Sequence, residues 1–154
     1  MSNNIEDISN FLQLSGRIAT AGQPTIEHYP AIAAAGYQVV INLALTDSPS
    51  ALADELTIAR DLGLDYIQIP VVWTEPTLAD FQAFMNIMAK YSTQKVFVHC
   101  AANKRVSAFL YLYRQLAEGI DEPTAYQDLA KIWIPNPSWQ DFIDSIKDMS
   151  DTIR

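Results

Sequence analysis

The stretch from Lys95 to Phe109 most constrains how this chain can fold, because it passes from a strand into a helix through a short loop. Val96–Val98 is an apolar run typical of a buried strand. Apolar residues at helical spacing then continue to Leu116. Cys100 is the only cysteine and falls where the strand ends. The pattern predicts a strand–loop–helix unit with a thiol in its loop.

The rest of the chain repeats this alternation of strands and helices. Strands are expected near residues 17–21, 37–43 and 65–70, and helices near residues 25–35, 48–62, 77–88, 121–133 and 137–149. Ser48 and Pro49 are expected to begin the helix near residues 48–62. Residues 5–14 are expected to form a short entry helix or hook. Thr77 and Asp80 resemble a capping box.

These elements predict a single α/β domain over residues 1–154, with helices on both faces of a mainly parallel sheet of four to five strands. Numbering only the four expected strands, we predict the order 1-2-4-3, with the cysteine strand inside the sheet. Ligands of such sheets bind beyond the carboxyl ends of the strands, which is where Cys100 falls.

Composition limits the partners that the protein can have. Ten basic and eighteen acidic residues give a net charge of −8, which argues against nucleic acid or an anionic membrane. A single cysteine excludes an intrachain disulfide, and two histidines do not make a metal site. The polar, acidic start of the chain shows no signal peptide, and no apolar run could span a bilayer. We therefore expect a cytoplasmic protein without a metal or other cofactor.

The loop after the strand has the residues of an activated nucleophile. A thiol at a helix N-terminus faces unpaired N–H groups and the positive end of the helix dipole, which favour the thiolate and bind anions. Lys104 and Arg105 would strengthen this effect, and Ser107 could hydrogen-bond the sulfur. Arg105 could also clamp an oxyanion through its planar guanidinium. A buried cysteine that merely ends a core strand is the alternative reading.

The two histidines are expected to have structural roles. His99 should point to the face opposite Cys100, because side chains alternate along a strand, and should hydrogen-bond backbone at the base of the loop. His28 is expected on a helix, either solvated or capping.

The order His99-Cys100, then Arg105 and Ser107, at a strand-to-helix junction resembles the signature of protein tyrosine and dual-specificity phosphatases. The turn at residues 21–25 and the Val-Val-Ile-Asn-Leu strand resemble more specifically the bacterial phosphatase-like domains of beta-lactamase-hydrolase-like proteins and those fused to NAD kinase. The resemblance covers about residues 15–118. It implies the small dual-specificity-phosphatase fold, a cysteine that attacks phosphate and an arginine that binds its oxygens.

Two departures from that signature bear on activity. The phosphatase signature has five residues between cysteine and arginine, whereas four separate Cys100 from Arg105. In an ungapped alignment Asn103 replaces a loop glycine and Val106 replaces the arginine; in a gapped one Arg105 keeps its role in a shorter loop. The family's acidic loop holds no aspartate here, so that Glu75 is the nearest carboxyl that could protonate a leaving oxygen, or else a solvated loop residue.

We therefore predict a cysteine-dependent phosphatase that acts on a phosphorylated substrate. The four-residue spacing also occurs in rhodanese-like sulfurtransferases, so a persulfide carrier is the second hypothesis, and an inactive binder of phosphate or another oxyanion is the third. The predicted catalytic residues are Cys100, Arg105, Ser107 and Glu75. The residues predicted to surround the anion are Ala101, Ala102, Asn103, Lys104, Arg105 and Val106.

Overall fold

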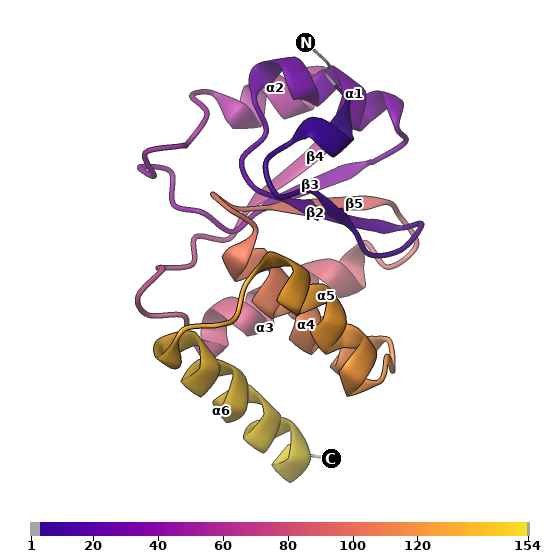
Figure 1. The fold of residues 1–154 in the computed structure, drawn as a ribbon. Coiled ribbons are helices and arrows are strands. Elements are labelled where there is room, and N and C mark those ends of the chain that lie inside the picture. The colour runs from indigo at the N-terminus through magenta and orange to yellow at the C-terminus, as the bar shows by residue number, and fades with distance from the viewer. Residues whose placement is uncertain (1–3, 154) are drawn as a thin grey trace.

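A five-stranded sheet lies at the centre of the molecule and separates two layers of helices (Figure 1). The computed structural model describes residues 4–153, so that residues 1–3 of the predicted polar N-terminus and Arg154 lie outside the described range. The strands are β1 (Leu12–Gln13), β2 (Ile18–Ala21), β3 (Val39–Asn42), β4 (Asp65–Gln68) and β5 (Val96–His99). The predicted α/β class, mainly parallel sheet and helices on both faces are confirmed.

The strand order is β1-β2-β5-β3-β4, and only the β1–β2 pair is antiparallel. The cysteine strand β5 is inside the sheet as predicted, but the predicted order is wrong because β5 lies between β2 and β3. Val96 pairs with Ile18 on one side and with Val39 on the other. Because β3 and β5 are both completely buried, their apolar patterns could not show which of them adjoins β2.

Residues 5–14, predicted as a short entry helix or hook, form a single 3₁₀ turn, η1 (Ile5–Asp7), followed by the edge strand β1. One predicted helix start differs from the structure. Helix α2 (Glu55–Asp61) begins seven residues after Ser48, because the Ser48 carbonyl accepts from the Ala51 N–H and closes a turn instead. The capping box of Thr77 and Asp80 is confirmed, with Asp80 N–H donating to Thr77 Oγ1 at 3.1 Å.

The two helical layers bury different faces of the sheet. A 3₁₀ turn η2 (Ile26–His28), helix α1 (Tyr29–Ala34) and α2 cover one face. Helices α3 (Leu78–Lys90), α4 (Lys104–Ala117), α5 (Glu122–Ile132) and α6 (Pro137–Ile153) lie on the other (Figure 1). Phe109 of α4 is at the centre of this second core, in ring contact with Phe81, Phe84, Trp139 and Phe142. None of the helices described over residues 4–153 is long and apolar enough to cross a membrane.

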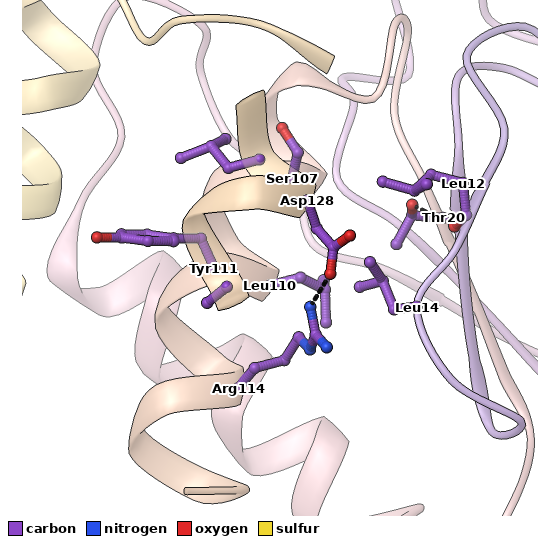
Figure 2. A pocket seen from close by; sticks show the side chains of 10 residues that line it. Leu12, Leu14, Thr20, Ser107, Leu110, Tyr111, Arg114 and Asp128 are labelled. Carbon is purple, nitrogen blue, oxygen red and sulfur yellow. Dashed lines mark hydrogen bonds and ion pairs between the residues drawn. The ribbon is translucent and has the colours of Figure 1, made fainter. Parts of the chain in front are cut away.

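Helix α5 is fixed against α4 by an ion pair. Arg114 Nη1 donates to Asp128 Oδ2 at 2.6 Å, and Figure 2 shows this pair beside Leu12 and Leu14 of the edge segment. The gap that these residues enclose is only about 10 Å³, too small for more than one water. The pair therefore closes the core rather than forming a ligand site.

Candidate active site

The loop that follows β5 forms one wall of a cavity of about 360 Å³. Cys100 is 1% exposed and lies immediately after the strand, and α4 begins four residues later. The residues that line the cavity are Trp73, Cys100, Ala101, Ala102, Lys104 and Arg105. The predicted cysteine, arginine and much of the predicted anion-binding loop are thus brought together.

The backbone of this loop offers a set of free donors. The N–H groups of Ala101, Ala102 and Lys104–Val106 have no acceptor within residues 4–153. Asn103 has φ of 65°, in the left-handed region that asparagine tolerates better than most residues. Consecutive N–H groups around such a residue form a concave nest that binds anions, and the dipole of α4 adds to it. Asn103 thus adopts a conformation that favours glycine, the residue it replaces in the ungapped alignment.

Arg105 connects the loop to the segment after β4. The side chain is 8% exposed, lines the cavity with Cys100, and donates from Nη1 to the Val71 carbonyl at 2.9 Å. Its guanidinium is therefore not directed to solvent. A guanidinium has five N–H donors, so this bond leaves others for an oxyanion in the cavity. Val106, which takes the position of the phosphatase arginine in the ungapped alignment, is an apolar core residue that does not line the cavity.

Trp73, which lines the cavity, packs against two other tryptophans. The ring centroids of Trp73 and Trp133 are 5.4 Å apart, and those of Trp73 and Trp139 are 5.8 Å apart. Trp139 Nε1 donates to the Trp73 carbonyl at 2.8 Å, which fixes the loop between β4 and α3. Lys104 Nζ lies 5.6 Å from the centroid of the Trp133 ring. The described lining of the cavity thus includes the aromatic ring of Trp73 and the cationic side chain of Lys104.

Ser107 and Glu75 are outside this constellation. The Ser107 hydroxyl donates to the Lys104 carbonyl at 2.9 Å and accepts from Trp133 Nε1, so its single proton is not directed to the sulfur. Ser107 also borders the small gap of Figure 2 rather than the cavity of Cys100. Glu75 is exposed, on the loop that carries Trp73, and is not among the residues that line the cavity.

The N-terminal segment braces the loop in a way that the sequence did not reveal. Asn10 Nδ2 donates to the Ala102 carbonyl at 3.0 Å, and Asn103 Nδ2 donates to the Asn10 carbonyl at 2.8 Å. Gly22 donates to the Ser9 carbonyl, and the following residue donates to the Ala101 carbonyl at 3.1 Å. The turn at residues 21–25 therefore lies directly against the loop that contains Cys100.

His99 lies on the sheet face opposite the cavity, as predicted, and its Nδ1 is 3.3 Å from the Cys100 carbonyl. Its other nitrogen, Nε2, is 2.6 Å from Oε2 of Glu55, a buried residue of α2 that sequence reasoning missed. Glu55 also accepts from Tyr29 Oη and from Gln23 Nε2. The other histidine, His28, hydrogen-bonds Thr25 at the start of η2 and caps this turn. Capping was one of the two roles predicted for it.

Within residues 4–153, no group of three or more His, Cys, Asp or Glu side chains is placed to hold a metal ion. The hydrogen-bond donors found at the cavity are the backbone N–H groups of the loop and the guanidinium of Arg105.

Comparison with known proteins extends the resemblance to most of the chain. Residues 2–133 match the model of the family described as DSP-PTPase phosphatase fused to NAD+ kinase. A beta-lactamase hydrolase-like protein of Xylella fastidiosa is 32% identical over 111 residues, which make up 70% of this chain and 25% of that protein. The chain thus spans about a quarter of the length of the curated relatives it matches.

Comparison with solved structures gives the same result as comparison of sequences. A crystal structure of a DUF442 protein from Shewanella putrefaciens CN-32 is 30% identical, has a TM-score of 0.85, and covers 96% of this chain and 97% of that one. The catalytic domain of the PP-IP phosphatase SIW14 from S. cerevisiae has a TM-score of 0.74 at 17% identity, with 94% and 93% coverage, and shows the shared fold alone. Together these matches establish that the chain belongs to the phosphatase family described as DSP-PTPase fused to NAD+ kinase.

Proposed function

We propose that this chain is a cysteine-dependent phosphatase that hydrolyses phosphate monoesters through a phosphocysteine intermediate on Cys100. The observation that supports this most is the series of unpaired backbone N–H groups in the loop that follows Cys100, in a cavity that also holds Arg105. Phosphoryl oxygens need several converging donors, and a thiol surrounded by them is poised both to bind and to attack. Family membership supports the same class of reaction.

In the proposed reaction the Cys100 thiolate attacks phosphorus and forms an S–P bond as the P–O bond to the leaving group breaks. The loop N–H groups and Arg105 stabilise the charge that spreads over the other phosphoryl oxygens. The leaving oxygen takes a proton, for which Glu75 is the proposed donor. Water then attacks phosphorus and transfers a proton to the carboxylate that Glu75 became in the first step. The S–P bond breaks, which releases inorganic phosphate and restores the Cys100 thiolate.

The acid assignment is tested by Glu75→Gln. If Glu75 protonates the leaving oxygen, the variant should hydrolyse an alkyl phosphate roughly a hundredfold more slowly, within the range that general acids contribute. p-Nitrophenyl phosphate should be affected much less, because its leaving group departs without protonation. Steady-state rates for the two substrates give the comparison. An alkyl phosphate rate equal to that of the wild type would remove Glu75 from the mechanism.

One observation favours a second function. Four residues separate Cys100 from Arg105, as in rhodanese-like sulfurtransferases, and the cavity lining contains no carboxylate. In sulfur transfer the thiolate attacks the outer sulfur of thiosulfate, sulfite leaves with the bonding electrons, and the resulting persulfide sulfur passes to cyanide. No leaving oxygen requires a proton in that sequence.

Turnover by the wild-type protein separates these functions. We expect release of phosphate from p-nitrophenyl phosphate near pH 6, and no thiocyanate from thiosulfate and cyanide. The opposite result would make the sulfurtransferase the better assignment. Protection of Cys100 from alkylation by phosphate, without turnover in either assay, would leave an anion-binding protein without phosphatase activity.

A further inference from the structure

Asn103 is a buried polar residue whose side chain is not used by the helix that it precedes. It is the N-cap of α4, where an asparagine usually accepts, through Oδ1, the N–H of the second or third helical residue. Those residues are Arg105 and Val106, and no such bond forms. Oδ1 is buried and has no hydrogen-bond partner among residues 4–153. The side chain therefore has a role other than capping α4.

The amide nitrogen of Asn103 faces two acceptors instead. Nδ2 donates to the Asn10 carbonyl at 2.8 Å and to Thr20 Oγ1 at 3.0 Å. A carbonyl can only accept, and the Thr20 hydroxyl gives its one proton to the Leu12 carbonyl at 2.8 Å. Both acceptors thus require a proton of the amide, which fixes the orientation of the side chain. The two bonds connect the start of α4 to β2 and to the segment before β1.

This orientation leaves the first turn of α4 available to a ligand. The N–H groups of Lys104–Val106 have no acceptor among the described residues. A capping side chain would occupy one of them, but it needs an extended backbone at the N-cap, whereas Asn103 is left-handed with φ of 65°. The bonds to Asn10 and Thr20 therefore hold the side chain where it does not compete for these donors.

Asn10 holds the same loop from the opposite direction. Its Nδ2 donates to the Ala102 carbonyl at 3.0 Å, so that the segment of Asn10 and the loop exchange two bonds. Asn10 is also left-handed, with φ of 52°. Each of the two asparagines thus combines a left-handed backbone with a side chain that bonds the segment of the other.

We propose that Asn103 is a positioning residue for oxyanion binding, whose amide bonds Asn10 and Thr20 and so keeps the first N–H groups of α4 in place and unoccupied. The proposal rests on the proposed function in taking the loop of Cys100 as the anion site. Asn103 itself does not line the cavity, so its effect on the anion is exerted through the backbone of the loop.

Glycine substitutions test this role without straining the backbone, because glycine adopts a positive φ freely. Asn103→Gly removes the bonds to Asn10 and Thr20, and Asn10→Gly removes the bond to Ala102. Calorimetric titration should give a dissociation constant for tungstate about tenfold higher in each variant, because the donors are no longer held in place. Asp54→Gly is the matched control, since Asp54 has φ of 59°, is exposed and does not line the cavity. Its tungstate affinity should equal that of the wild type.

Asn103→Asp distinguishes positioning from a general effect on folding. Aspartate keeps the shape of the side chain, but its carboxylate has no proton to give to the Asn10 carbonyl and can accept the N–H of Arg105 or Val106. It then competes with the oxyanion for these donors and repels its charge. The aspartate variant should therefore bind tungstate more weakly than Asn103→Gly does, and equal or tighter binding would overturn the proposal.

A further measurement needs no anion. Nitrogen-15 relaxation should give lower order parameters for the N–H groups of residues 101–106 in Asn103→Gly than in the wild type. Unchanged order parameters, or wild-type tungstate affinity, in folded Asn103→Gly would overturn the proposal. If Asn103→Gly does not fold, the same two measurements on Asn10→Gly, at an exposed position, decide. Failure of the wild type to bind tungstate would count against the proposed function, and the order parameters would still decide the role of Asn103.

Discussion

Replacement of Cys100 by serine is expected to abolish phosphate ester hydrolysis while leaving oxyanion binding intact. A serine hydroxyl is not ionised near neutral pH, and no described side chain lining the cavity is a histidine or carboxylate that could activate it. The rate with p-nitrophenyl phosphate should fall by roughly a thousandfold or more. Binding should persist, because the free N–H groups of the loop and Arg105 are unchanged.

Calorimetric titration of wild-type and Cys100→Ser protein with tungstate checks the second half of this expectation. Thermal unfolding of both proteins controls for a change in stability. Hydrolysis by the serine variant at the wild-type rate would show that Cys100 is not the nucleophile. Loss of tungstate binding in a folded serine variant would show that the loop N–H groups are not sufficient for the anion.

Gly22→Ala is expected to have the largest effect on stability among glycine changes in this chain. A Cβ at Gly22 would lie 2.7 Å from the Ala101 carbonyl oxygen and 3.0 Å from that of Ser9. Both neighbours are backbone atoms that cannot rotate away, so the loop of Cys100 must shift. Overpacking of this kind costs about 2–3 kcal/mol. In a chain of this size that lowers Tm by roughly 5–10 °C.

Gly16→Ala is the matched control, because a Cβ at Gly16 meets nothing within 4 Å. Differential scanning calorimetry of the two variants gives the stability difference, and tungstate titration gives the effect on the site. We expect Gly22→Ala to weaken tungstate binding at least about tenfold, because misplacement of several donors weakens them together. Equal Tm values for the two variants would contradict the predicted clash.

The sequence was sufficient for features that depend on local pattern. The run from Val96 through Cys100 into α4 predicted the strand, the loop and the helix, since each is determined by neighbouring residues. The capping pair of Thr77 and Asp80 was predictable for the same reason. The family resemblance predicted the fold of the whole domain, which no local sequence pattern could indicate.

The features that were missed depend on contacts between distant residues. Helix α2 starts at Glu55 rather than near Ser48, and Glu55 meets His99 across 44 positions of sequence. A glutamate in a helical pattern ordinarily indicates a solvent-exposed face, so the sequence did not indicate that Glu55 is buried. The order of β3 and β5 was likewise invisible, because both strands are apolar on both faces.

The reciprocal bonds between Asn10 and the loop of Cys100 have a consequence for the order of folding. They join residues 92 and 93 positions apart, so the loop cannot acquire its final geometry until the sheet has brought the two segments together. We therefore expect the loop of Cys100 to be among the last parts of the domain to reach its final geometry. An oxyanion that binds this loop as proposed would bind only its completed form, and would therefore raise the free energy of unfolding of the whole domain.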